Sequence, residues 1–118
     1  MSGARHGVSA PLLHLIAAEQ WRAGGSVLPG PQGFVHLSTP EQVHLPANRL
    51  YAGRTDMLVL RVDPARLSSE LRWEHGVPAD PSAMRFPHLY GPLPATAVIA
   101  VLDYLPGADG TFAAPAID

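Results

Sequence analysis

Two histidines interrupt short apolar segments of the sequence. His14 lies within residues 12–16, LLHLI, and His36 lies within residues 33–37, GFVHL. An imidazole in such a strand needs a hydrogen-bond partner or a solvent-lined cleft to offset its desolvation. If the two strands are neighbours, both rings can face one groove and act on a bound molecule. The alternative is a pair of core histidines that bond to backbone carbonyls.

A third histidine lies in the stretch FPHLYGP, residues 86–92. Two prolines and a glycine restrict the backbone there, and the pattern predicts a loop just before a strand. Rigid loops that present His and Tyr are a common way to build a site, so His88 and Tyr90 are candidates. The alternative is a structural turn in which Phe86 and Tyr90 close the edge of the core. The remaining histidines are expected to have no chemical role: His6, His44 and His75.

Glu74 follows Trp73 at the end of a short alternating segment, residues 71–74. A carboxyl group beside an indole can have a raised pKa and serve as a general acid or base. Arg72 in the same segment can pair with Glu74 or bind a phosphate group. The alternative for both residues is an ordinary exposed position on a strand.

Ser38 and Thr39 stand at the clearest helix start in the sequence. Thr39 is a good N-cap, Pro40 suits the first helical position, and Gln42 can close a capping box. Pro46 should bend this helix or delay its first hydrogen bonds. Because free N–H groups and the helix dipole favour anions at this end of a helix, Ser38 and Thr39 are also candidates for ligand binding.

The rest of the chain predicts the elements that must position these groups. Apolar and alternating runs predict strands at residues 12–16, 33–37, 57–62, 71–74 and 97–105. Helical turns are expected at residues 17–23, from 39 to about 51 and, briefly, at 63–67. Short strands and few helices, without regular βαβ alternation, indicate an α+β domain.

Composition limits the chain to one small domain and excludes several chemistries. The 118 residues are 47% hydrophobic and 15% charged, which is typical of a single globular domain. We expect a flexible lead-in at residues 1–10, the domain at 11–105 and a partly ordered tail at 106–118. The chain has no cysteine and no lysine, which excludes thiolate nucleophiles, cysteine-bound zinc, Schiff bases and a phosphate-loop lysine.

Charge and hydropathy give expectations about partners and location. The net charge of −2 argues against general binding to nucleic acid or to anionic membranes. The apolar stretch near the N-terminus is too short to span a bilayer and lacks the charge pattern of a signal peptide. A cytoplasmic protein is therefore the expectation, and the sequence leaves its oligomeric state open.

Several motifs together resemble the bacterial DUF952 family. They are LLHLI, GFVHLSTPEQV, MLVLRVD, LRWE and FPHLYGPL, in this order over residues 12–104. The resemblance implies a reduced version of the ADP-ribosyltransferase fold, which is a small split β-sheet with two or three helices. Family members mostly lack an established activity, so the resemblance implies more about fold than about function.

The resemblance brings a set of site positions with it. In the wider fold, two strand motifs and a third region grip NAD around its nicotinamide ribose. The first motif corresponds to His14, and the second to His36, Ser38 and Thr39. The third position stays open between three residues: Glu74, His88 and Tyr90. The chain has no glutamate after Glu74, which departs from the usual transferase pattern of a glutamate just ahead of a late strand.

The function that the resemblance implies is a transferase or glycohydrolase that acts on NAD or an ADP-ribose-type nucleotide. Breaking the nicotinamide–ribose bond passes through an oxocarbenium-like state, whose charge Glu74 would stabilise. Phe86 or Tyr90 would stack on the nicotinamide. The candidate catalytic residues are Glu74, His36 and His88. The candidate ligand-binding residues are His14, Ser38, Thr39, Arg72, Phe86 and Tyr90.

Two other interpretations stay open. A non-catalytic or repurposed module could bind a small metabolite in the same cleft. A metal site of His14, His36, His88 and Glu74 would suit zinc or iron, although the sequence has no H-x-x-x-H spacing. The sequence assigns no cofactor with certainty, and NAD is the candidate substrate.

Overall fold

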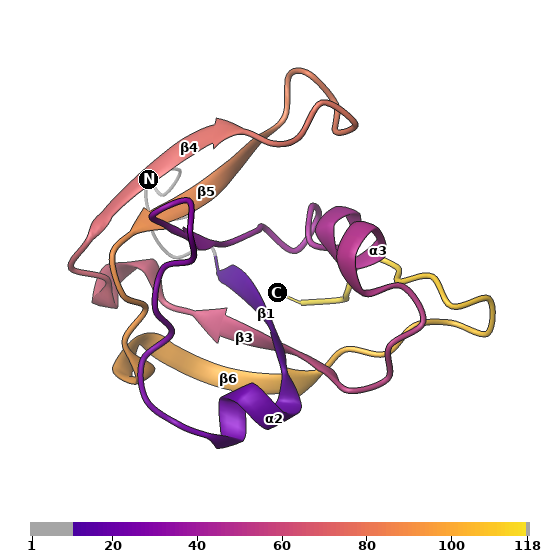
Figure 1. Cartoon of the computed structure of the whole chain (residues 1–118), viewed down its shortest axis with the longest axis horizontal. Helices are drawn as coiled ribbons and strands as arrows, with labels where there is room; N and C mark the ends of the chain where they lie inside the picture. The colour runs from indigo at the N-terminus through magenta and orange to yellow at the C-terminus, as the bar shows by residue number, and fades with distance from the viewer. Residues whose placement is uncertain (1–10, 118) are drawn as a thin grey trace, which may run out of the picture.

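Two antiparallel three-stranded sheets and two α-helices make up residues 11–117, the part of the chain that the computed structural model describes (Figure 1). The α+β class predicted from the sequence is confirmed. The first sheet has the strand order β1 (Leu12–Ala17), β3 (Met57–Val62), β6 (Val98–Asp103). The second has the order β2 (Val35–His36), β5 (Arg85–Tyr90), β4 (Glu70–His75). The helices are α2 (Ala18–Arg22) and α3 (His44–Tyr51), with 3-10 turns at Pro64–Arg66 and Ala95–Ala97. The expected lead-in at 1–10 lies outside the described residues.

β3 is the central strand of the first sheet, and its bounds are those that the sequence predicts. Its sequence, MLVLRV, is apolar on both faces except at Arg61, which suits a strand covered on both sides. β1 pairs with β3 from Leu12 opposite Val62 to Ala17 opposite Met57, and β6 pairs on the other side. β1 is therefore an edge strand of this sheet, and alternation places His14 on the same face as Leu12.

β5 is the central strand of the second sheet, so the prediction that its residues form a loop is wrong. β2 pairs with one side of β5 and β4 with the other. Pro87, which suggested a loop, is tolerated because β2 ends at His36. The Pro87 carbonyl accepts the Leu37 N–H at 3.0 Å, and the missing proline N–H would point to the same side, beyond the end of β2. His88 is thus a buried strand residue.

The segment after β2 joins the two sheets. Leu13 in β1 donates its N–H to the Ser38 carbonyl at 2.7 Å, and Ser38 donates to the Leu13 carbonyl at 2.9 Å. Two residues earlier on the same segment, His36 pairs with His88 in the second sheet. The two sheets separate between β1 and β2, and we call this place the split. The hydrogen bonds across it bring His14 next to His36.

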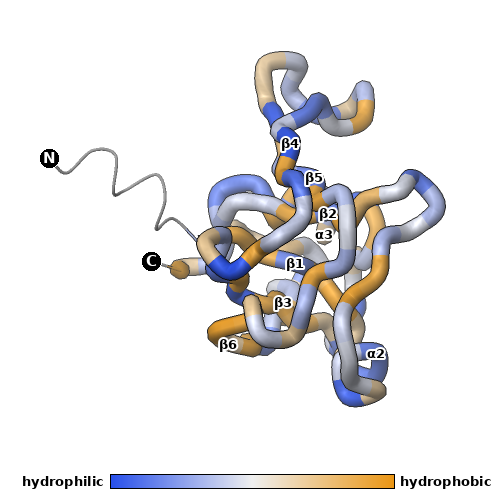
Figure 2. Tube along the Cα trace, turned by 90° about the vertical axis from the view of Figure 1, so that its left-hand side faces the viewer, coloured by the Kyte–Doolittle hydropathy of each residue, from blue (hydrophilic) through white to orange (hydrophobic). Residues whose placement is uncertain are grey.

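Buried side chains form two clusters, one on each face of the first sheet. One lies between the two sheets and contains Leu12, Val35, Leu37, Val62, Leu89, Leu93 and Ala97. The other lies against α3 and contains Leu13, Val43, Ala47, Met57, Val59, Tyr104 and Phe112. Successive side chains of a strand face opposite sides, so neighbouring leucines of β1 enter different clusters. Figures 1 and 2 show the β4–β5 hairpin extending beyond the rest of the domain.

The regular helix α3 begins later than the capping motif predicts. Gln42 accepts the Thr39 N–H through Oε1 at 3.0 Å, which is half of the expected capping box. The Gln42 side chain also donates to the Arg85 carbonyl in β5, so it ties the turn to the second sheet. The first regular helical residue is His44, which leaves Pro46 in the first turn, where its missing N–H costs no helical bond.

The segment after β6 contributes to the core, although its Gly, Ala and Pro content suggested only partial order. Phe112 is 3% exposed, and its ring centroid lies 4.8 Å from that of Tyr104. Asn48 in α3 accepts the Phe112 N–H at 2.7 Å and donates to the Phe112 carbonyl at 2.9 Å. Burial raises the pKa of Tyr104 to about 12, and its hydroxyl donates to the Ala113 carbonyl.

Candidate functional site

His14 is fixed in one tautomer by its contact with β2. Its Nδ1 lies 2.8 Å from the carbonyl oxygen of His36. Because a carbonyl oxygen only accepts, Nδ1 carries the proton and Nε2 keeps its lone pair in the neutral ring. Burial lowers the pKa of His14, against the raising effect of this hydrogen bond. His14 is therefore a neutral acceptor near pH 7, half-buried at the split between the sheets.

A small pocket lies beside His14 at the junction of β1, β2 and α3. Its volume is about 140 Å³. It is lined by His14, Leu15, His36, Ser38, Pro46, Arg49, Leu50 and Tyr51. Pockets for drug-sized ligands measure about 300–1,000 Å³, so this one has room for a single small ring or sugar. Any larger ligand must extend over the adjoining surface.

The adjoining surface is one face of the second sheet, and we call it the histidine face. It consists of Phe34, His36, Glu74, His88 and Tyr90. The rings of Phe34 and His88 stack at 4.0 Å between centroids, and His36 meets the edge of each, at 4.7 Å from Phe34 and 5.3 Å from His88. His36 also lines the small pocket, so the pocket and the histidine face share this residue.

Glu74 connects two other members of the histidine face. Its Oε1 lies 2.8 Å from His88 Nδ1 and accepts the Tyr90 hydroxyl at 2.7 Å. These two hydrogen bonds, from Tyr90 first and then His88, lower the pKa of Glu74. The expectation that Trp73 raises this pKa is therefore wrong. Adjacent residues of a strand face opposite sides, so the indole does not cover the carboxylate.

Arg49 and Arg72, the two arginines beside the site, each form an ion pair with a carboxylate. Arg72 binds Glu70 through two hydrogen bonds, of 2.9 and 3.0 Å, and its guanidinium lies 4.4 Å from the centre of the Tyr90 ring. Arg49 of α3, which lines the pocket, binds Asp80 of the β4–β5 loop at 3.1 Å. Arg49 uses only Nη1 in its ion pair and Arg72 uses Nε and Nη2, so each keeps further N–H donors that a phosphate could bind.

The predicted site residues are brought together in part. His14, His36 and Ser38 line the pocket, whereas Glu74, His88 and Tyr90 lie on the adjoining histidine face. Arg72 lies beside Tyr90.

Two further candidates are placed differently. The buried Phe86 lies on the same face of β5 as His88 and opposite Glu74 of β4, and its ring packs near Gly76 at the start of the β4–β5 loop. Thr39 is in the turn before α3, so neither it nor Ser38 stands at the start of the regular helix.

Phe34 is the site residue that sequence reasoning missed. It was assigned only to a strand, although it stands two positions before His36 and therefore on the same face. Alternation within GFVHL was the available signal.

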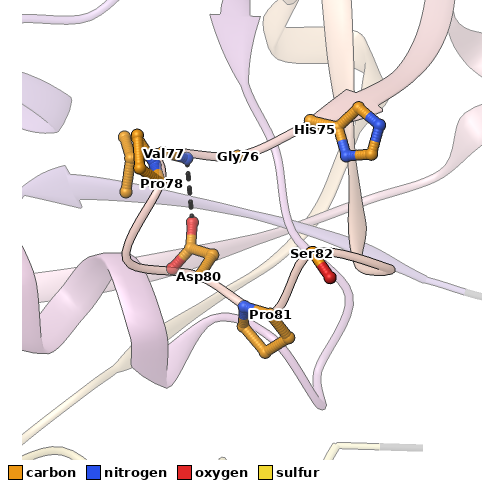
Figure 3. A pocket seen from close by; sticks show the side chains of 7 residues that line it. All are labelled: His75, Gly76, Val77, Pro78, Asp80, Pro81 and Ser82. Carbon is orange, nitrogen blue, oxygen red and sulfur yellow. Dashed lines mark hydrogen bonds between the residues drawn. The ribbon is translucent and has the colours of Figure 1, made fainter.

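A second hollow, of about 260 Å³, lies within the β4–β5 loop, away from the histidines of the site (Figure 3). Asp80 accepts the Val77 N–H there at 3.1 Å and also binds Arg49. Its carboxylate is already engaged, and the other polar side chains that line the hollow are those of His75 and Ser82. This hollow is a feature of the loop rather than a second site.

Comparison with known families decides the family of this chain. The family model described as "Protein of unknown function (DUF952)" matches residues 14–101. The chain belongs to the DUF952 family. The match includes the histidine motifs of β1, β2 and β5, so the site lies within the part of the chain that defines the family.

Solved structures similar to this DUF952 chain come from protein CC0527 of Caulobacter crescentus. Its crystal structure is 28% identical, covers 87% of this chain and 93% of that chain, and superposes with a TM-score of 0.73. Its solution NMR structure is 29% identical, covers 86% and 90%, and gives a TM-score of 0.69. No curated protein matches. These likenesses support the fold and name no activity.

The structure also bears on metal and membrane binding by this DUF952 chain. Within residues 11–117, no three His, Asp or Glu side chains are placed to hold a metal ion together. The suggested metal site of His14, His36, His88 and Glu74 therefore lacks a ligand set. Neither described helix has the length and apolar character needed to cross a bilayer.

The state of His14 predicts a pH dependence of stability. Its pKa is lower in the folded DUF952 domain than the ordinary value of 6.5. The unfolded chain therefore takes up this proton first as the pH falls, so stability should be lost from about pH 6.5 downward. Urea unfolding at pH 8, 7, 6 and 5 should show a smaller acid loss for His14→Gln than for the wild type. An equal loss in both would contradict a neutral, desolvated His14.

Proposed function

We propose that this DUF952 protein binds NAD or an ADP-ribose-type nucleotide at the pocket and histidine face and cleaves the nicotinamide–ribose bond of NAD. The single observation that carries the proposal is the position of His36. Its ring lines the pocket beside His14 and also contacts His88 and Phe34. Groups from β1, β2 and β5 therefore meet around this residue.

The proposal takes an ADP-ribosyltransferase-like architecture from the family resemblance. In that fold, as the family resemblance implies, NAD is gripped by motifs on two strands and by a third region. Here His14 stands on β1 and His36 on β2, directly at the split, and His88 on β5 lies beside His36. The arrangement matches the order of motifs on which the proposal rests.

The pocket is suited to the smaller half of such a ligand. A space of about 140 Å³ accommodates a ribose or a nicotinamide ring but not a dinucleotide. The lone pair of His14 Nε2 can accept a hydrogen bond from a ribose hydroxyl, and Ser38 adds a polar group nearby. Arg49 and Arg72 flank the site and are the candidates for the pyrophosphate.

The direct test is to incubate the protein with NAD and follow nicotinamide release by chromatography, with thermal shifts measured for NAD and ADP-ribose. We expect both ligands to raise the melting temperature and nicotinamide to appear with turnover. His14→Ala should abolish both effects, whereas Trp73→Ala, on the opposite face of β4, should keep them. Thermal shifts without release would favour the non-catalytic binding module. No shift with either ligand would overturn the proposal.

A further inference from the structure

We infer that His88 is the general base of the site: its Nε2 takes a proton from the water that attacks the ribose of NAD. This step rests on the function proposed above. It assigns the reaction as hydrolysis and gives Glu74 a role different from charge stabilisation.

The orientation of the His88 ring follows from its bond to Glu74. The lowered pKa of Glu74 keeps its carboxylate ionised, and a carboxylate accepts but cannot donate. Nδ1 of His88 therefore donates across the 2.8 Å contact, and Nε2 is left with its lone pair in the neutral ring. A base oriented by a carboxylate on its other nitrogen is a recurring arrangement in hydrolytic enzymes.

The ring is held in place and its second nitrogen is accessible. Phe34 stacks on one face of His88 at 4.0 Å with an interplanar angle of 16°. His88 is only 7% exposed, yet Nε2 makes no hydrogen bond within the described residues and is not among their buried unpartnered atoms. Its lone pair is therefore accessible to solvent, next to the ring of His36, which lines the pocket.

The step balances as a hydrolysis. The oxygen of water forms a bond to C1′ of the ribose, and the bond from C1′ to the nicotinamide nitrogen breaks. The electron pair of the broken bond moves to the ring nitrogen, which leaves as neutral nicotinamide. The proton of water passes to Nε2 of His88 and then to solvent, and ADP-ribose is the second product.

Glu74 acts here as a positioning residue. Its Oε1 accepts from both His88 and Tyr90, so this oxygen fixes the orientation of the ring. Tyr90 donates to the same oxygen, and this hydrogen bond raises the pKa of Tyr90, so the phenol stays protonated and the carboxylate stays in place. Arg72 over the Tyr90 ring completes the support.

Other charged groups bear on a pH profile at His88. His36 faces it from β2, and Glu74 and Arg72 lie on β4. Partial burial lowers the pKa of His36, with smaller contributions from His88 and then Arg49, so this neighbour is neutral near pH 7. The ionised Glu74 is thus the charge in direct contact with the His88 ring.

The test measures the rate of NAD hydrolysis at saturating NAD from pH 5 to 9. A base must be unprotonated to act, so we expect a rate that falls on the acid side. His88→Gln should lower kcat by about 100-fold or more and remove that acid limb. Glu74→Gln should lower kcat less than His88→Gln, because the ring stays in place but loses the carboxylate that keeps the proton on Nδ1. The matched control is Glu70→Gln, which removes the neighbouring carboxylate of β4 that binds Arg72 instead, and it should lower kcat less than Glu74→Gln does.

A second readout does not depend on turnover. In ¹⁵N-labelled protein, nitrogen shifts of His88 should show a protonated Nδ1 and a free Nε2, and Glu74→Gln should weaken this preference. Wild-type kcat and an unchanged acid limb in a folded His88→Gln protein would overturn the base assignment while leaving the proposed function standing. A proton on Nε2 instead of Nδ1 would also overturn it. Absence of NAD cleavage by the wild type would instead overturn the proposed function itself.

Discussion

Phe112→Ala should lower the free energy of unfolding by about 3–5 kcal/mol, the usual cost of removing a buried aromatic side chain. Phe112 is 3% exposed and belongs to the cluster against α3 with Leu13, Met57 and Tyr104. Its ring lies 4.8 Å from that of Tyr104, so the substitution also removes an aromatic pair. Urea unfolding followed by circular dichroism measures the change.

Leu105→Ala is the matched control for this prediction. Leu105 belongs to the same C-terminal segment but is 60% exposed, so its truncation should change stability by less than about 0.5 kcal/mol. A similar small loss for Phe112→Ala would show that the segment does not pack as the structure has it. The two Asn48 hydrogen bonds to the Phe112 backbone stay in place in the variant, so the measurement isolates the ring.

The strands with strong patterns could be predicted from the sequence. The nearly continuous apolar run MLVLRV predicts the bounds of β3, because a strand covered on both faces is mostly apolar. β5 was missed because Pro87 reads as a strand breaker. Its missing N–H is harmless only because β2 ends after His36, and the length of a partner strand is not written in the sequence of β5 itself.

The burial of Phe112 could not be predicted from the sequence, for a different reason. It stands in a segment rich in Gly, Ala and Pro, whose composition is typical of a loose tail. The residues that order this segment are distant in sequence. The Asn48 side chain of α3 hydrogen-bonds to both the N–H and the carbonyl of Phe112, and residues of β1 and β3 pack in the same apolar cluster as its ring. Contacts of this kind depend on the tertiary arrangement and leave no local pattern.

The histidines of the candidate site could be predicted from the sequence, but the hydrogen bonds between the site residues could not. An imidazole within an apolar strand needs a partner, and this rule singled out His14 and His36, whose ring and carbonyl meet at the split. The chemistry of Glu74 was misjudged because Trp73 is adjacent in sequence but lies on the other face. Cross-strand neighbours set its state, and these follow from the pairing of β4 with β5.

His36→Ala should weaken binding of NAD and ADP-ribose by about tenfold or more, which corresponds to about 1.4 kcal/mol, and should cost little stability. Its ring is shared by the pocket and the histidine face, so its removal separates the two parts of the site. The His36 carbonyl that accepts from His14 is unaffected by the substitution, and the residue is exposed. We therefore expect a loss of stability below about 1 kcal/mol.

We expect the opposite result for Val35→Ala on the same strand, a loss of stability with little change in ligand affinity. Val35 is 2% exposed and packs in the cluster between the sheets, so its truncation should cost about 2 kcal/mol of stability. Because its side chain points away from the histidine face, affinity for ADP-ribose should change little. Calorimetric titration and urea unfolding of both variants separate the two effects. If His36→Ala destabilises the domain as much as Val35→Ala and still binds ADP-ribose normally, His36 is a structural residue and the site must be sought elsewhere.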